Sequence, residues 1–319
     1  MKVLVTGGAG FIGSHVVDRC LADGHEVVVL DNFSTGRREF IRAPLQHPRT
    51  TLVEADVFIQ PDRVTEAMQG CDLVFHLAAN ADVRFGLEHP RRDLEQNTIA
   101  TFHVLEAMRA AGVNRIAFAS TGSVYGEAAV IPTPEDAPFP VQTSLYATSK
   151  LAGEGLISSY CEGYGFQGYI FRFVSLLGER YSHGHVFDFL RKLRANPNRL
   201  DVLGDGHQKK SYLYVGDCME AMFCALENAT DPVNIFNLGT DEYVEVNDSI
   251  QCICDHLNLS PELVYAGGDR GWVGDNPFIF LDCQRIRSLG WAPTRSIRES
   301  IVSTVEYLMS ESWLLEART

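Results

Sequence analysis

The stretch Thr6-Gly7-Gly8-Ala9-Gly10-Phe11-Ile12-Gly13 decides the fold, because it joins a predicted strand at residues 3–6 to a predicted helix at residues 11–23. Both spacings of a phosphate-binding glycine loop are present, Gly7-x-x-Gly10-x-x-Gly13 and Gly8-x-Gly10-x-x-Gly13. Glycines at such a turn let the backbone approach a pyrophosphate, and the helix N-terminus supplies N–H donors and partial positive charge. The stretch therefore predicts a dinucleotide-binding loop.

A carboxylate follows the second predicted strand. That strand covers residues 26–30, and Asp31 comes 18 residues after Gly13. A carboxylate at this place accepts hydrogen bonds from the adenosine ribose and repels a 2′-phosphate, so NAD is favoured over NADP, although Arg37 and Arg38 follow closely. Asp56, and Leu77-Ala78-Ala79 after the fourth strand, are predicted to line the same cofactor.

Short apolar runs alternate with helical patterns through the first half of the chain. The predicted strands cover residues 3–6, 26–30, 51–54, 73–77, 116–119 and 169–173. This alternation predicts an α/β fold, a Rossmann-type doubly wound parallel sheet. After about Phe173, predicted loops at 178–184, 196–206 and 267–277 separate shorter helices at 217–228 and 246–257. We expect an NAD-binding domain at residues 1–173, to which a segment near 211–240 returns, and a smaller C-terminal α/β substrate lobe at 174–319.

Composition excludes several classes of partner. The 319 residues carry a formal net charge of −14, which disfavours nucleic acid and anionic membranes as partners. The apolar runs are far too short to span a bilayer. The eight cysteines come without a secretory leader and are predicted to be reduced and mostly buried, and the Cys252-x-Cys254 pair lacks the further ligands of a zinc site. We expect a soluble, cytoplasmic protein without a metal.

The pair Tyr146 and Lys150 indicates chemistry on an alcohol. Their spacing places both on one face of a predicted helix at residues 146–164. A phenol beside an ammonium and a cationic nicotinamide has a lowered pKa and can take a proton from an alcohol as hydride leaves carbon. Lys150 can also hold the nicotinamide ribose, and Thr121, at the end of the fifth strand, can hydrogen-bond the same substrate oxygen. The alternative is a half-buried Tyr146 and a solvated Lys150.

Taken together, these motifs resemble those of the extended short-chain dehydrogenase/reductase family, in its UDP-glucose 4-epimerase-like branch of nucleotide-sugar enzymes. The resemblance covers nearly the whole chain. Beyond the motifs above, it rests on residues 76–79 and 120–126, on the later block 203–215, and on Gly268-Asp269-Arg270-Gly271-Trp272-Val273-Gly274-Asp275.

The resemblance implies a 4-epimerase cycle with Tyr146, Lys150 and Thr121 as catalytic residues. Tyr146 removes the proton of the sugar 4-hydroxyl, NAD takes the C4 hydride, and the 4-keto sugar turns over and receives the hydride on its other face. The implied cofactor contacts are Gly7, Gly10, Phe11, Ile12, Gly13, Asp31, Asn32, Ser34, Thr35, Gly36, Asp56, Val57, Leu77, Ala78, Ala79, Asn97, Ser120, Tyr146, Lys150 and Val174. The implied contacts to the nucleotide sugar, a UDP-hexose, are Thr121, Ser123, Ser175, His185, Val186, Lys210, Tyr212, Arg270 and Asp275.

Related reactions need groups that this chain lacks. Dehydratases of the family carry an Asp-Glu pair after the active-site Thr, and glucuronate decarboxylases carry a Glu. Gly122 and Ser123 occupy these positions and cannot act as acids or bases at neutral pH. A UDP-glucuronate 4-epimerase stays open, because Arg180 or Arg84 could meet a C6 carboxylate. A catalytically silent NAD-sensing protein would keep the glycine loop and lose the Tyr–Lys pair.

Three positions bear on the sugar. Ser175 and Glu179 depart from the family pattern, which has Asn and Pro there, and Phe278 aligns with a bulky position associated with unsubstituted hexoses rather than N-acetylhexosamines. The resemblance further implies a homodimer formed through helices around residues 92–111 and 145–164.

Overall fold

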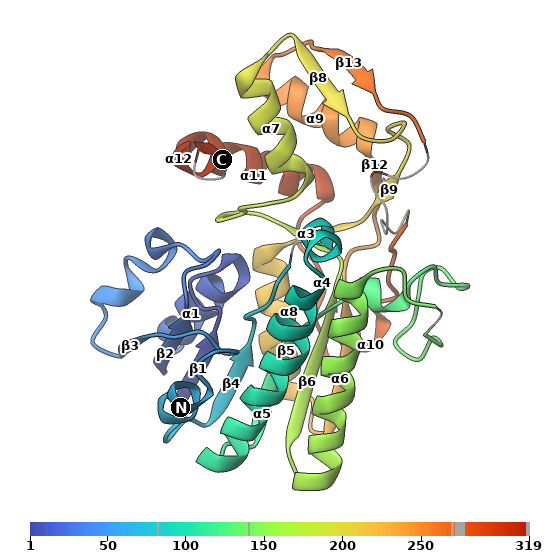
Figure 1. The fold of residues 1–319 in the computed structure, drawn as a ribbon. Helices are drawn as coiled ribbons and strands as arrows, with labels where there is room; N and C mark the ends of the chain where they lie inside the picture. The colour runs from blue at the N-terminus through green and yellow to red at the C-terminus, as the bar shows by residue number, and fades with distance from the viewer. Residues whose placement is uncertain (82, 140, 269–270, 272–277, 317–319) are drawn as a thin grey trace. The chain divides into compact units, whose positions relative to one another are not determined.

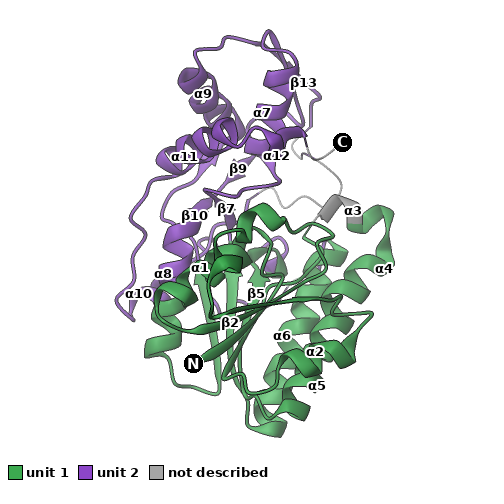
Figure 2. Ribbon diagram, turned by 90° about the vertical axis from the view of Figure 1, so that its left-hand side faces the viewer, with its two compact units in different colours: residues 1–124, 144–173, 222–237 green, residues 125–143, 174–221, 238–319 purple. Residues whose placement is uncertain are grey.

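The computed structural model describes the chain except for residues 82, 140, 269–270, 272–277 and 317–319 and except for the side chains of residues 83–85. The chain forms two compact units (Figure 2). Unit 1 comprises residues 1–124, 144–173 and 222–237, and unit 2 comprises residues 125–143, 174–221 and 238–319. Residues 125–143, which we expected in the first domain, thus group with unit 2, and the segment that returns to unit 1 is shorter than 211–240.

A seven-stranded sheet forms the centre of unit 1 (Figure 1). Its order is β11-β6-β5-β4-β1-β2-β3, and the strands from β6 to β3 pair in parallel. This is the order of a doubly wound dinucleotide-binding fold, with its switch point between β1 and β4, and it confirms the predicted fold class. The strands are β1 (Lys2–Thr6), β2 (Glu26–Asp31), β3 (Thr50–Glu54), β4 (Leu73–His76), β5 (Arg115–Thr121), β6 (Gln167–Phe173) and β11 (Val233–Leu238).

Helices cover both faces of this sheet because its strands are apolar on both sides. Leu4, Val74 and Ile116 pack in one buried cluster with residues of α2 (Pro61–Ala67), α5 (Ala100–Ala111) and α6 (Leu145–Tyr164). On the other face, Phe223 of α8 (Val215–Asn228) packs against Phe75, with 5.7 Å between the ring centroids, beside α1 (Phe11–Ala22). The shorter elements of the unit are η1 (Arg38–Ile41), η2 (Pro44–Gln46), α3 (Val83–Glu88), α4 (Pro90–Asp93) and the π-helical turn η3 (Leu94–Ile99), and η4 (Gly122–Tyr125) leads out of it.

In the described part of unit 2, the strands form two-stranded pairs. The pairs are β7 (Ser175–Leu177) with β10 (Tyr212–Tyr214), β9 (Lys209–Lys210) with β12 (Val244–Glu245), and β8 (Arg199–Val202) with β13 (Glu262–Tyr265). The predicted loop at 196–206 is therefore wrong in part, because it contains β8. The helices are α7 (His185–Ala195), α9 (Val246–Leu257), α10 (Gln284–Arg287), α11 (Ile297–Ser310) and α12 (Trp313–Glu316).

A buried carboxylate, Asp217, holds two segments of unit 2 together. Asp217 is 4% exposed and accepts hydrogen bonds from the Thr294 hydroxyl, at 2.6 Å, and from the Arg295 N–H, at 3.1 Å. The indole of Trp291 donates to the Asp217 carbonyl oxygen at 3.0 Å. These bonds tie the start of α8 to the segment that leads into α11.

All eight cysteines are outside disulfides and seven of them are buried, as predicted. In the described part of the chain, no helix has both the length and the apolar character needed to cross a bilayer. Nor do the described side chains contain a group of three or more His, Cys, Asp or Glu residues placed to hold a metal ion.

Candidate active site

The glycine loop closes tightly on itself between β1 and α1. Gly7 has a φ of +68°, and a Cβ there would lie 2.8 Å from the backbone nitrogen of Ala78. A Cβ at Gly13 would lie only 2.1 Å from the Gly7 carbonyl oxygen. Helix α1 then begins after Gly10 without a side-chain cap. The loop thus has the cradle and the helix N-terminus that a pyrophosphate requires.

Asp31 is built into the wall of this loop. Its side chain accepts hydrogen bonds from the backbone N–H of Ala9, at 2.9 Å, and of Phe33, at 2.7 Å. Burial raises the pKa of this carboxyl, and the two backbone bonds act in the opposite direction. A Cβ at Gly36 would approach the carboxylate to 2.7 Å, so glycine is needed to keep the space beside it. These observations fit the ribose-binding carboxylate of an NAD site.

The neighbouring strand ends are also ordered by carboxylates. Asn32 donates to Asp56 at 2.6 Å, and Asp56 accepts from the backbone N–H of Phe58 at 2.8 Å. Arg38 forms an ion pair with Glu54. Arg38 therefore pairs with a carboxylate of the protein itself, so its presence is weaker evidence for a site that binds the 2′-phosphate of NADP. Other predicted cofactor residues of unit 1 lie on the segments that follow β1, β2, β3 and β4. They are Phe11, Ile12, Ser34, Thr35, Val57, Leu77 and Ala79.

His76, at the end of β4, belongs to the support of the loop. Its Nδ1 lies 2.8 Å from the Thr6 hydroxyl and its Nε2 lies 3.0 Å from the Thr101 hydroxyl, which donates to the carbonyl of Asn97. Thr101 thus accepts from Nε2–H, and the ring is neutral with both nitrogens bonded. Burial and the charge of Lys150 lower the pKa of His76 to about 3. This histidine is structural and is not an acid or base in the reaction.

Lys150 is buried at the first turns of α6. The side chain is 3% exposed, and Nζ donates to the Ala119 carbonyl of β5 at 2.8 Å. Helix α6 approaches β5 closely, because a Cβ at Gly153 would lie 2.8 Å from the Phe118 ring. Burial lowers the pKa of Lys150 to about 8, against the charges of Asp93 and Glu154, which raise it. The alternative of a solvated lysine is therefore wrong.

Tyr146 and Thr121 come together, as the sequence predicts. The Tyr146 hydroxyl hydrogen-bonds the Thr121 side chain, and Thr121 in turn lies 3.2 Å from the hydroxyl of Ser123. Burial raises the pKa of Tyr146 to about 12, the Thr121 bond lowers it and Asp93 raises it. The lowered pKa predicted from the sequence is for a phenol beside a cationic nicotinamide, whereas in the chain by itself burial outweighs the polar contacts. A lowered value requires a further positive charge beside the phenol.

Two buried carboxylates near Tyr146 and Lys150, Glu154 and Asp93, were not predicted from the sequence. Glu154 is bonded by Ser120 and forms a buried ion pair with Arg172, with 2.6 Å between Nη2 and Oε2. Its position four residues after Lys150, on the same helix face, could have revealed it. Asp93 is 1% exposed and has no such signal, since it lies in a segment that also carries the exposed side chain of Arg91.

Asn97, a predicted cofactor contact, is anchored within the protein. Its Nδ2 donates to the Ser149 hydroxyl at 2.9 Å and its Oδ1 accepts from the Asn80 N–H at 2.8 Å. Ser149 donates to the carbonyl of Tyr146 at 2.7 Å. The amide therefore connects the π-helical turn η3 to the helix that holds Tyr146 and Lys150.

Six of the predicted residues that belong to unit 2 lie in the described part of the chain. The structure brings His185 and Tyr212 together, with 2.9 Å between Nδ1 and the phenol oxygen and 4.8 Å between stacked rings. His185 Nε2 is shielded from solvent and has no hydrogen-bond partner among the described residues. Burial and the charge of Lys210 lower the pKa of His185 to about 3. A neutral ring with one nitrogen open suits a ligand contact.

The other predicted positions of unit 2 differ in what they offer. Ser175 is exposed and pairs with Tyr212 in the β7–β10 ladder, whereas Val174 and Val186 are buried, Val186 completely. Arg270 and Asp275 lie outside the described residues.

Glu179, Arg180 and Phe278, which also bear on the sugar, belong to unit 2. Glu179 accepts a hydrogen bond from the Tyr214 hydroxyl at 2.8 Å, and Arg180 has a φ of +64°. Phe278 packs against Tyr243, with 5.1 Å between ring centroids. The side chain of Arg84 lies outside the described residues.

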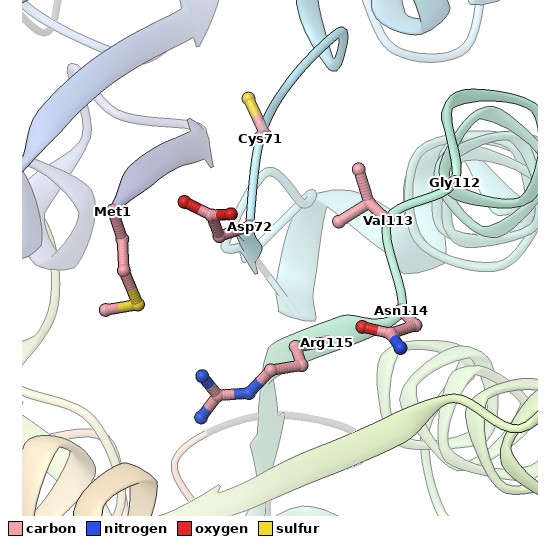
Figure 3. A pocket seen from close by; sticks show the side chains of 7 residues that line it. All are labelled: Met1, Cys71, Asp72, Gly112, Val113, Asn114 and Arg115. Carbon is pink, nitrogen blue, oxygen red and sulfur yellow. The ribbon is translucent and has the colours of Figure 1, made fainter.

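A surface pocket of about 560 Å³ lies at the amino-terminal ends of strands β1, β4 and β5 of unit 1 (Figure 3). Its lining residues precede β1, β4 and β5 or, for Arg115, begin β5, and they are Met1, Cys71, Asp72, Gly112, Val113, Asn114 and Arg115. Ligands of doubly wound sheets bind at the carboxyl ends of the strands. This pocket is therefore not the site assembled by the glycine loop, Thr121 and Tyr146.

Known proteins resemble this chain over nearly its whole length. Residues 3–239 match the model of the NAD dependent epimerase/dehydratase family. A putative UDP-glucose 4-epimerase of Methanocaldococcus jannaschii is 33% identical over 97% of this chain and 99% of its own. A crystal structure of a UDP-galactose 4-epimerase is 40% identical with a TM-score of 0.87, covering 98% of this chain and 100% of that one.

A third relative was solved with ligands. The UDP-glucuronic acid 4-epimerase of Bacillus cereus, in complex with UDP-glucuronic acid and NAD, is 26% identical with a TM-score of 0.89, covering 98% of this chain and 100% of that one. The chain, with its glycine loop, Asp31 and the Tyr146–Lys150 pair, therefore belongs to the NAD dependent epimerase/dehydratase family, in the extended short-chain dehydrogenase/reductase group, and uses NAD as its cofactor.

Proposed function

We propose that the chain is a 4-epimerase of UDP-hexoses that interconverts UDP-glucose and UDP-galactose through a transient 4-keto sugar. The observation that supports it most is the hydrogen bond of Tyr146 with Thr121, next to a buried Lys150. The relatives that are 33% and 40% identical carry the names of UDP-glucose and UDP-galactose 4-epimerases.

The proposed chemistry divides between residues and cofactor. NAD, when bound, supplies a hydride acceptor for C4 of the sugar and a positive charge on its ring. Tyr146 takes the proton of the 4-hydroxyl and later returns it, so proton and hydride both end on the same carbon–oxygen unit and no net oxidation occurs. Thr121 holds the same oxygen, and Lys150 adds a positive charge near the phenol. Gly7, Gly13 and Asp31 would hold the cofactor.

Acid–base groups for other reactions at C5 or C6 are missing after Thr121. Gly122 has no side chain, and the Ser123 hydroxyl lies 3.2 Å from Thr121. A serine does not exchange protons at neutral pH without an activating base. Dehydration and decarboxylation are therefore disfavoured, which supports epimerisation at C4.

A second candidate is 4-epimerisation of UDP-glucuronate. The likeness to the Bacillus cereus enzyme, with its TM-score of 0.89, supports it. Against it stands the lower identity, 26% compared with 40% for the UDP-galactose 4-epimerase. A silent NAD sensor is a poorer reading, because the buried Lys150 and the bonded Tyr146 would have no purpose in it.

The test is to incubate the purified protein separately with UDP-glucose, UDP-galactose and UDP-glucuronate and to follow the anomeric protons by NMR. We expect interconversion of the first two. Conversion of UDP-glucuronate alone would replace the hexose by a uronate. Tyr146→Phe should lower the rate by about 10³-fold, the scale of a lost general base. Tyr164→Phe, at an exposed tyrosine of the same helix, is the matched control and should leave the rate unchanged.

We also propose a homodimer. Helices α5 and α6 contact each other, and apolar side chains on them and on the adjoining turn are exposed, at Leu94, Phe102, Leu145 and Tyr164. Exposed apolar groups of this number near one helix pair fit a self-association surface. Sedimentation velocity should give twice the mass of the chain, and a Phe102→Glu substitution should shift it toward the monomer.

A further inference from the structure

A buried carboxylate lies beside the residues that carry the proposed chemistry. Asp93, the last residue of α4, is 1% exposed. A carboxylate removed from water this far costs free energy unless donors and charges compensate it. Oδ1 accepts hydrogen bonds from the side-chain amides of Asn80, at 2.8 Å, and of Asn97, at 3.4 Å.

Asp93 is connected to the catalytic helix by hydrogen bonds. The same Nδ2 of Asn97 that faces Asp93 donates to Ser149 at 2.9 Å, and Ser149 donates to the carbonyl of Tyr146 at 2.7 Å. Ser149 lies between Tyr146 and Lys150 on α6. A chain of three side chains thus runs from the carboxylate to the backbone that orients the phenol and the ammonium.

The backbone of α3 leaves room for this carboxylate. A Cβ at Gly86 would lie 2.1 Å from Asp93 Oδ2. A side chain at position 86 would therefore displace the carboxylate. The local sequence is consistent with a fixed place for Asp93.

We propose that Asp93 is a positioning residue for Tyr146 and Lys150: it fixes Asn97 and Ser149 against helix α6, and it adds a negative charge to the surroundings of the Lys150 ammonium. The proposal rests on the proposed function and deepens it, because it assigns to Asp93 a role in orienting Tyr146 and Lys150. Asp93 acts on the reacting groups through Asn97 and Ser149 and through its charge.

The charged and titratable groups around Lys150 allow this assignment. From α6 comes Glu154, which Arg172 of β6 pairs with at 2.6 Å. From β4 comes His76, which is neutral, and from the start of α6 comes Tyr146. The ion pair with Arg172 offsets the charge of Glu154, so Asp93 has the larger effect among the carboxylates that raise the pKa of Lys150.

The test titrates Lys150 directly by NMR of protein labelled with ¹³Cε-lysine. The chain has only five lysines, so the spectrum is simple, and Lys150→Arg assigns the signal. We expect a midpoint near pH 8 in the parent protein and a midpoint lower by about one unit in Asp93→Asn, since the raising charge is removed. Glu95→Gln, which removes a carboxylate from an ion pair with Arg91 in the next turn, is the matched control and should leave the midpoint unchanged.

An unchanged Lys150 midpoint in Asp93→Asn, or an equal shift in Glu95→Gln, would overturn the proposal. If Asp93→Asn does not fold, Asp93→Ser, smaller and equally uncharged, decides by the same measurement. This readout needs no substrate, so it is independent of the epimerase assignment. With an active substrate, the pH profile of kcat/KM should also move to lower pH in Asp93→Asn, because the charge raises the pKa of Tyr146 and Lys150 alike.

Discussion

Two histidines, one in each unit, are kept neutral by burial, and they differ in what their second nitrogen does. His76 in unit 1 has both ring nitrogens within 3.0 Å of threonine hydroxyls. His185 in unit 2 bonds Tyr212 through Nδ1 and leaves Nε2 without a partner among the described residues. A ring whose two nitrogens are both hydrogen-bonded has a structural role, whereas a ring with one unbonded nitrogen can still form a hydrogen bond to a ligand.

Two ion pairs, one in each unit, also differ in burial. In unit 1, Glu154 and Arg172 form an ion pair that is 5% and 2% exposed, and Glu154 lies on the same face of α6 as Lys150. In unit 2, Arg199 and Asp201 pair at 2.9 Å with about half of each side chain exposed or more. Unit 1 thus uses buried, mutually satisfied groups to hold its chemistry in place, and the surface pair of unit 2 has little to hold.

The largest expected effect comes from breaking the buried pair. Arg172→Met leaves the Glu154 carboxylate buried without its cation, which should lower the free energy of unfolding by about 3–5 kcal/mol. Arg199→Met in unit 2 removes the exposed pair and should cost about 0.5 kcal/mol or less. Urea unfolding of the three proteins measures both. Equal losses would mean that burial does not distinguish the two units.

The next effect is the pH dependence of stability due to His76. Its pKa is about 3 in the folded chain and 6.5 as the ordinary value, so the unfolded state binds a proton between these values and the folded state does not. Stability is therefore lost as pH falls below about 6.5, by about 2 kcal/mol at pH 5 for this one group. His76→Gln should reduce the loss between pH 7 and pH 5, measured by urea unfolding. His89→Gln, at an exposed residue, should leave the loss as in the parent protein.

The smallest effect concerns His185. His185→Leu removes the open nitrogen, and a lost hydrogen bond to a charged ligand should raise KM for the nucleotide sugar by about tenfold with little change in kcat. His76→Gln should leave KM unchanged, because its ring faces only protein groups. A KM that responds to His76 and not to His185 would reverse the roles given to the two histidines. Steady-state kinetics on both variants decides.

The strongest sequence predictions concern residues whose function depends on local spacing. Gly7, Gly10 and Gly13 reveal a phosphate cradle because the chain itself must turn there, and Tyr146 and Lys150 share a helix face because of the helical repeat. The strand Arg199–Val202 was missed, since two-stranded pairs depend on a partner far along the chain, Glu262–Tyr265. Asp93 was missed because nothing local separates a buried carboxylate from a solvated one.

The sequence by itself determined the doubly wound fold, the NAD site at the ends of its strands and the pairing of Tyr146 with Lys150, because each follows from spacing along one segment. Only the tertiary structure decided how those groups are charged. Burial sets the pKa of Lys150 to about 8 and that of Tyr146 to about 12, and Asp93 reaches both from a different helix. Desolvation and long-range Coulomb interactions depend on what surrounds a residue in space, which its neighbours in sequence do not specify.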